Sequence, residues 1–320
     1  MGPPYSSVTT DAYPCRVASV DPDIARLAPL PAWPREELRL ANRTLSVRHA
    51  PGSRSDLPGA LYVHGLGGSS LNWTDFMHGM QSRVDGWAVD VGGFGYSPPP
   101  RDGDMSPSGH ARSLVDLIAH LDIAPVHLFG NSMGGAVALQ LAARRPDLVR
   151  SLTLISPALP SLSLTKQNAH LPVIAVPGVG ERLVPKFMEA DAETRVRGSI
   201  DVTYADPSRV APERLQEAAD ETRQHDRLPY ASEAFLRSLR GLLRTFTDVG
   251  PNRPWKLAER VSCPTLVIYG RKDPLVDSRT AHRVTKHFRH AHVVVLPDSG
   301  HVAQMEHPEF VLAAWERFIG

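Results

Sequence analysis

The sequence contains few cysteines. Only two occur in 320 residues, Cys15 and Cys263, and they are far apart. Two thiols cannot build a disulfide scaffold, and neither cysteine has a partner at the spacing of metal ligands. We therefore expect no disulfide framework and no metal site.

Charge of one sign and long apolar runs are also scarce. The formal net charge is +1, and no stripe of Lys and Arg could follow a phosphate backbone, so we expect no nucleic-acid partner. No apolar run is long enough to be a transmembrane segment. The N-terminus lacks the basic start and apolar stretch of a secretory signal, so a cytoplasmic location is expected.

Short apolar strands alternate with helices in two stretches, residues 36–156 and 255–320. Residues 37–49 alternate apolar and polar side chains and predict an antiparallel hairpin. Nearly all-apolar strands that alternate with helices predict a mostly parallel sheet covered on both faces, an α/β fold. The strands are expected at 60–63, 86–91, 126–129, 152–155, 265–269 and 292–296, and the helices at 71–80, 107–121, 136–145, 278–288 and 310–318.

Two segments do not follow this alternation. Residues 1–35 are rich in Pro, Ser and Asp without periodicity, which predicts an extended arm. Residues 157–254 lose the strand signal, which predicts a helical lid inserted into the core. One helix of this lid gathers apolar side chains on one side, and we interpret them as packing rather than ligand contact: Phe235, Leu236, Leu239, Leu242, Leu243 and Phe246.

The strongest chemical signal is a G-x-S-x-G pattern at residues 130–134, between a predicted strand and a predicted helix. Small residues at both ends let the strand and helix approach closely, so that Ser132 stands on a sharp turn. The following helix directs its N-terminal amides at this point, where they favour negative charge. Ser132 is therefore a candidate nucleophile, and a helix-capping serine is the alternative.

A serine nucleophile needs a base that is itself oriented by an acid. Asp273 follows the strand predicted at 265–269 and His301 follows the strand at 292–296, so both should project from the same sheet edge as Ser132. Asp277 and Asp298 are the rival acids. We favour Asp273, because Asp277 precedes a helix as a cap would and Asp298 is close in sequence to the histidine.

A glycine-rich loop, HGLGG, follows the strand predicted at 60–63. In this architecture an oxyanion hole combines an amide of that loop with the amide after the nucleophile, which predicts Leu66 and Met133. His64 is interpreted as a structural histidine that pins the loop, with a second base as the alternative. The residues flanking these groups are expected to contact substrate: Gly65, Gly67, Asn131 and Val302.

Together these motifs resemble the α/β-hydrolase superfamily over residues 37–320. The series is HGLGG, DVGGFGYS, GNSMGG, GRKDPLV and SGHVAQMEHPEF, in this order. Relatives usually carry proline where Gly92 stands. The resemblance implies an α/β-hydrolase fold with an inserted lid and a triad of Ser132, His301 and Asp273 that needs no cofactor.

GNSMGG and GHVAQMEHPEF also look like the meta-cleavage-product hydrolases, which split carbon–carbon bonds with the same triad. Two features depart from that group: HGLGG replaces H-G-x-G-P-G, and Val302 replaces the usual Trp after the histidine. That group also uses a lid arginine on its substrate, for which Arg195 and Arg197 are candidates. Epoxide hydrolases and haloalkane dehalogenases use an Asp nucleophile, which Ser132 disfavours.

The expected activity is hydrolysis of an apolar carboxylic ester, a small-molecule substrate, through an acyl-enzyme of the carboxylesterase or lipase type. A carbon–carbon hydrolase is the first alternative, followed by thioesterase, lactonase and perhydrolase variants. A ligand-binding receptor on the same fold is the alternative from another class.

Overall fold

The computed structural model describes residues 25–161, 165 and 167–320. Its centre is a single sheet of eight strands in the order β1-β2-β4-β3-β5-β6-β7-β8. Strands β1 and β2 form the predicted antiparallel hairpin, and the strands from β4 to β8 in this order are parallel to one another. The strands span Arg35–Arg39, Thr44–Ala50, Gly59–Val63, Asp85–Val89, Val126–Asn131, Val149–Ile155, Thr265–Gly270 and Ala291–Leu296 for β1 to β8.

The complete burial of the central strands explains why their sequences are apolar throughout. Every residue of β3, β5 and β7 is buried. A parallel strand is covered on both faces, so its sequence does not alternate between apolar and polar side chains. This confirms the prediction of an α/β fold from runs such as TLVIY.

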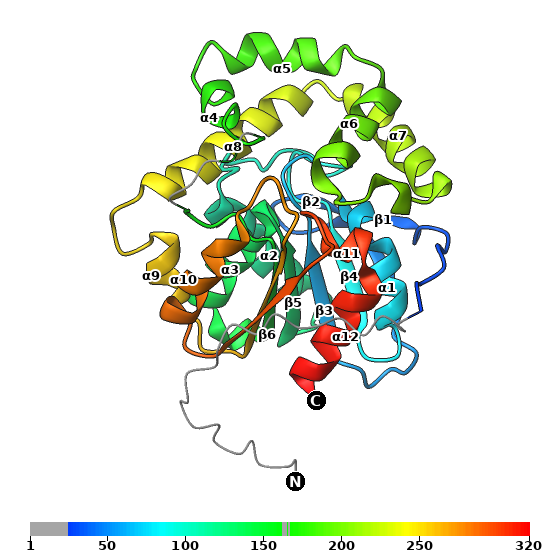
Figure 1. Cartoon of the computed structure of the whole chain (residues 1–320), viewed down its shortest axis with the longest axis vertical. Helices are drawn as coiled ribbons and strands as arrows, with labels where there is room; N and C mark the ends of the chain where they lie inside the picture. Colours follow the sequence, from blue (N-terminus) through cyan, green and yellow to red (C-terminus); the bar gives the residue numbers. More distant parts are fainter. Residues whose placement is uncertain (1–24, 162–164, 166) are drawn as a thin grey trace.

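Helices cover both faces of the sheet (Figure 1). Helices α2, α3, α9 and α10 pack together on one face, and α1, α11 and α12 on the other. Each layer encloses its own apolar cluster. Their bounds are α1 Thr74–Met80, α2 Pro107–Leu121, α3 Met133–Arg144, α9 Pro254–Ala258, α10 Ala281–His287, α11 Ala303–Glu306 and α12 Pro308–Ile319, with 3-10 turns η1 Ser70–Trp73, η2 Pro146–Leu148 and η4 Ser278–Thr280.

The helical segment of residues 171–247, between β6 and β7, lies over one end of the sheet, as Figure 1 shows. We call it the cap. It touches the loops that follow β3, β4 and β8, because Gly67, Gly93 and Gly300 each lie against cap atoms. The cap therefore covers the carboxyl ends of the strands. Its helices are α4 Leu171–Ile174, α5 Gly180–Met188, α6 Ala192–Thr203, α7 Pro212–Asp226 and α8 Ala231–Thr247, with the turn η3 Pro207–Arg209.

Helix α8 packs between the core and the cap helix α5. Leu236, Leu239 and Leu242 are buried, as the packing interpretation expects, with Leu242 in the apolar core and Leu236 against Gly180 of α5. Phe235 differs from them, because it is only half-buried and would lie 3.7 Å from a Cβ built on Gly67. That side chain therefore overhangs the loop after β3.

Helix α7 and the turn before it bind the cap to the core through charged groups. Arg214 pairs with Asp75 at 2.6 Å, and Glu221 pairs with Arg48 at 3.2 Å. Burial raises the pKa of the Glu221 carboxyl, and the charge of Asp90 adds to this effect. The Arg48 guanidinium opposes that shift and stabilises the ionised carboxylate.

Residues 1–24, most of the predicted arm, lie outside the described residues. Residues 25–34 form no helix or strand, and the first strand begins at Arg35. The division into arm, core and lid stays a prediction.

The strand–helix junction after β5 is closed by two glycines. A Cβ on Gly130 would lie 2.4 Å from the Gly134 carbonyl oxygen, and one on Gly134 would lie 2.2 Å from the Val63 carbonyl oxygen. No side chain fits at such distances from backbone atoms. The junction therefore requires glycine at both ends of the G-x-S-x-G pattern.

Gly134→Ala is expected to lower the free energy of unfolding by about 3 kcal/mol, because β3 and α3 must move apart. Gly198→Ala is the matched control, since a Cβ on this glycine inside α6 meets nothing within 4 Å. The control should gain about 0.5–1 kcal/mol from its better helix propensity. Urea unfolding measures both, and equal midpoints for Gly134→Ala and wild type would refute the close contact.

Candidate active site

Ser132 occupies the sharp turn between β5 and α3. Its φ is 54° and its ψ is −118°, a backbone conformation that residues other than glycine rarely adopt. The turn is held from both sides: the Ser132 N–H donates to the Ile155 carbonyl at 3.0 Å, and its own carbonyl accepts from Ala158 at 2.9 Å. The side chain stays half-exposed between the core and the cap.

His301 and Asp273 form a buried pair. The imidazole Nδ1 lies 2.9 Å from Asp273 Oδ2, with the two side chains 6% and 0% exposed. Asp273 Oδ1 also accepts from the N–H groups of Leu275 and Val276. Burial by itself raises the pKa of Asp273, but His301 and the Val276 amide outweigh it, so the pKa is lowered. Asp273 is therefore an ionised carboxylate that orients the imidazole.

The backbone of His301 is fixed on both sides. Its N–H donates to the Thr203 carbonyl of the cap at 2.6 Å, and its carbonyl accepts from Asn131 Nδ2 at 3.0 Å. Because Asn131 precedes Ser132, this second bond joins the loop that bears His301, which we call the histidine loop, to the turn that bears Ser132. Within the described residues no hydrogen bond joins the Ser132 hydroxyl to His301, and such bonds often tighten only when substrate binds.

The three predicted residues thus follow three parallel strands, β5, β7 and β8, at one edge of the sheet. The rival acids lie elsewhere. Asp277 accepts from the Arg279 N–H as a helix cap, and Asp298 pairs with Lys272 on the surface.

The loop after β3 lies against Ser132. Gly68 donates to the Gly65 carbonyl at 3.1 Å, and Gly67 has a φ of 76°, so the loop is a tight turn that needs glycine at this position. A Cβ on Gly65 would lie 3.1 Å from Ser132 Cβ. Across the described part of the chain, no hydrogen bond uses the N–H of Leu66 or of Met133. Both amides are therefore available to an oxyanion.

His64 is completely buried beneath this loop. Its Nε2 accepts from the Val91 N–H at 3.1 Å, so the proton must be on Nδ1, which lies 2.7 Å from the Gly65 carbonyl. Burial lowers the pKa of the imidazole, which keeps it neutral. These contacts agree with the interpretation of His64 as a residue that pins the loop.

The predicted substrate contacts have different surroundings. Gly65 and Gly67 line the loop beside Ser132, and Val302 is buried next to His301. The Asn131 amide donates to the carbonyls of Ile155 and His301, so its NH₂ group is used inside the protein. Contact between these residues and substrate stays a prediction.

Three residues near the site were not found from the sequence. Phe235 overhangs the loop after β3, but its place among the apolar residues of α8 gave no sign of this. Asp90 accepts from Ser70 and Tyr96 and so braces the loop after β4. Glu306 lies five residues after His301 within SGHVAQMEHPEF, where the motif itself was the available signal.

Metal and membrane sites can be assessed only for the described ranges. Within residues 25–161, 165 and 167–320, no cluster of three or more His, Cys, Asp or Glu side chains could hold a metal ion. In the same ranges, no helix combines the length and apolar character needed to cross a membrane.

The fold and the site define an α/β protein with a serine on a strained strand–helix turn. The family model described as alpha/beta hydrolase fold matches residues 61–308. The chain therefore belongs to the α/β-hydrolase family.

Named relatives share this architecture. The chain is 30% identical over 253 residues to a 2-hydroxy-6-oxononadienedioate/2-hydroxy-6-oxononatrienedioate hydrolase of Paraburkholderia xenovorans, covering 77% of this chain and 81% of the relative. It is 30% identical over 254 residues, 78% of its length, to the dihydrolipoyllysine-residue acetyltransferase component of the acetoin cleaving system of Pseudomonas putida, and spans 60% of that protein.

Solved structures also match the fold. The 2-hydroxy-6-oxo-6-phenylhexa-2,4-dienoate hydrolase of Rhodococcus sp. strain RHA1 matches with a TM-score of 0.70 and 22% identity, covering 89% of this chain and 98% of that structure. Proteins named as lipases and esterases are also among the structural neighbours. At these identities the likeness concerns the fold alone.

His64→Leu is expected to destabilise the protein and to loosen the loop after β3. The change leaves the buried Val91 N–H without its partner, at about 1–3 kcal/mol, and removes one of the two donors to the Gly65 carbonyl, which Gly68 still binds. His120→Leu, at an exposed position near the end of α2, is the control and should stay close to wild type. Thermal unfolding compares them, and a wild-type melting temperature for His64→Leu would rule out the pinning role.

Proposed function

We propose that the chain is a serine hydrolase that cleaves carboxylic esters through an acyl-enzyme. The observation that carries this proposal is the buried His301–Asp273 pair, whose loop is bonded through Asn131 to the turn that bears Ser132. A neutral imidazole held by a carboxylate is the general base that a serine hydroxyl requires.

In the proposed reaction, Ser132 Oγ attacks the ester carbonyl while His301 Nε2 takes its proton. Asp273 stabilises the imidazolium that forms, and the amides of Leu66 and Met133 hold the oxyanion. His301 then protonates the leaving alkoxide, and the alcohol departs. Water, deprotonated by His301, attacks the acyl-enzyme; His301 then returns this proton to Ser132 Oγ as the acyl–oxygen bond breaks, which releases the acid and free Ser132. No step needs a metal or a cofactor.

The side chains around Ser132 favour an apolar substrate of small to medium size. Val302 follows His301 in the chain, Leu66 lies in the loop after β3, and Phe235 of the cap overhangs that loop. Such side chains favour acyl or aryl groups over charged ones, because an ion here would lose its hydration without a partner.

Carbon–carbon bond hydrolysis of the meta-cleavage-product type is the second candidate. It is favoured by the named activity of the Paraburkholderia xenovorans relative and by the motif GHVAQMEHPEF. The candidate lid arginines do not support it, because Arg195 pairs with Asp226 and Arg197 pairs with Glu193. Both guanidinium groups are thus already engaged by acidic residues of the cap.

Thioesterase, lactonase and perhydrolase activities use the same machinery and remain variants of this proposal. A ligand-binding receptor would not need an oriented base, so the buried His301–Asp273 pair favours an enzyme over a receptor. A cytoplasmic location stays a prediction.

Ser132→Ala is expected to abolish covalent labelling by a fluorophosphonate probe and to lower kcat/KM for a p-nitrophenyl ester by roughly 10⁶-fold. The nucleophile is lost while the fold is kept, which circular dichroism can verify. Ser82→Ala, at an exposed position after α1, should label and turn over like wild type. An unlabelled wild-type protein, or a labelled Ser132→Ala variant, would reject the proposal.

The two candidate reactions are separated by substrate. We expect kcat/KM for p-nitrophenyl butyrate to exceed that for a 2-hydroxy-6-oxo dienoate by about 10²-fold or more, because both candidate lid arginines, Arg195 and Arg197, are already paired with acidic residues. Arg197→Ala should leave ester turnover unchanged. Efficient dienoate cleavage that is lost in Arg195→Ala or Arg197→Ala would favour the carbon–carbon hydrolase instead.

A further inference from the structure

Glu306 is a buried carboxylate that sits between the histidine loop and the cap. Its side chain is fully buried at the end of the short helix α11. On one side, Oε2 accepts from the Gly300 N–H at 2.6 Å and from the Ser299 hydroxyl at 3.4 Å. On the other side, Oε1 accepts from the N–H groups of Ala205 and Asp206 at 2.9 and 2.8 Å.

The backbone of this part of the cap also touches the histidine loop directly, at Thr203 and Ala205. The Thr203 carbonyl accepts the His301 N–H at 2.6 Å. A Cβ on Gly300 would lie 2.4 Å from the Thr203 oxygen and 2.6 Å from the Ala205 nitrogen, so only glycine allows this approach. The cap chain after α6 is thus packed against the residue that precedes the base.

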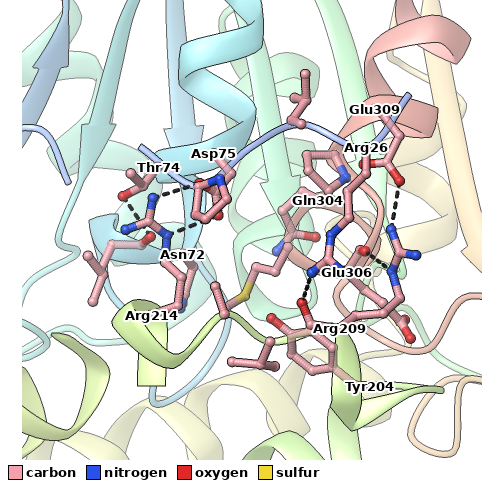
Figure 2. A pocket seen from close by; sticks show the side chains of 17 residues that line it. Arg26, Asn72, Thr74, Asp75, Tyr204, Arg209, Arg214, Gln304, Glu306 and Glu309 are labelled. Carbon is pink, nitrogen blue, oxygen red and sulfur yellow. Dashed lines mark hydrogen bonds and ion pairs between the residues drawn. The ribbon is translucent and has the colours of Figure 1, made fainter. Parts of the chain in front are cut away.

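Arg209 secures the far end of this contact. Its guanidinium donates to the Glu306 carbonyl at 2.7 Å and to the Glu309 carboxylate at 2.8 Å. Figure 2 shows these groups at the edge of a cavity of about 50 Å³, lined also by Tyr204 and Gln304. Among the described residues, neither Oε1 nor Nε2 of Gln304 has a hydrogen-bond partner. A cavity of this size has room for the few water molecules that could bind these two atoms.

We infer that Glu306 is a positioning residue for the base: it binds the cap to the histidine loop and thereby fixes His301 against Ser132. This inference rests on the proposed function, because it assigns a role toward the proposed triad. The cap is therefore part of the support of the base as well as a cover over the substrate.

The chemistry of a carboxylate explains why a glutamate is suited to this place. An ionised carboxylate offers only acceptors, and here both oxygens face N–H or O–H donors. A glutamine has one acceptor oxygen, and its NH₂ group must face N–H donors on one of the two sides. Glu306→Gln therefore keeps the shape but breaks either the cap side or the loop side of the bridge.

The experiment compares Glu306→Gln with Glu309→Gln, using the full-length protein and a p-nitrophenyl ester. Glu309 is a matched control: it is also buried and bonded to Arg209 of the cap, it has no hydrogen bond or ion pair with residues 299–301, and a glutamine at this position can still accept from Arg209. We expect kcat to fall about 10²-fold in Glu306→Gln, with KM within about twofold, since a small displacement of the base affects the chemical step. Glu309→Gln should keep the wild-type kcat.

A spectroscopic readout separates positioning from a loss of stability. The Nδ1 proton of His301, bonded to Asp273, gives a low-field proton resonance that should shift or broaden in Glu306→Gln and stay in place in Glu309→Gln. Glu306→Asp, which keeps the charge but is one methylene shorter, should lie between Glu306→Gln and wild type. It replaces the glutamine variant if that variant does not fold.

Each outcome has a separate meaning. A folded Glu306→Gln with wild-type kcat and an unchanged resonance overturns the inference, as does an equal loss of kcat in both variants. An inactive and unlabelled wild-type protein overturns the proposed function instead. In that case the resonance of His301 still shows whether Glu306 positions it.

Discussion

The conformation of one residue, Ser132, sets the arrangement of the rest of the site. Its φ of 54° costs on the order of 1–3 kcal/mol and persists only because the surroundings fix it. The carbonyl of Ile155, the amide of Ala158 and the glycines on either side provide that fixation. The packed sheet therefore maintains this strained conformation, and Ser132 stands where strands β5 and β6 end and helix α3 begins.

His301 is fixed in a different way, by hydrogen bonds from two residues to its backbone. Asn131 holds the His301 carbonyl from the nucleophile turn, and Thr203 holds its N–H from the cap. The side chain is then oriented by Asp273, whose second oxygen is held by two backbone amides. The geometry of the proposed triad thus depends on backbone hydrogen bonds from three separate parts of the chain.

Much of this could be predicted from the sequence because the signals are local. The strand runs, the glycines around Ser132 and the places of Asp273 and His301 after strands follow from short patterns, and the structure brings these residues to one edge. Phe235, Glu306 and Thr203 could not be predicted, because their roles depend on how the cap lies on the core. Residues from α6 and α8 meet loops more than ninety residues away in the chain, and no periodicity encodes that contact.

The short distance between Gly300 and the cap backbone bears on how this fold can be re-engineered. Caps are often regarded as modules that could be exchanged between related enzymes to change the substrate. Here a transplanted cap would also have to present a carbonyl at the place of Thr203 and two amide groups at the places of Ala205 and Asp206. A chimera that lacked those few residues would gain a different cover over the sheet but would lose the hydrogen bonds that hold the loop of His301 in place.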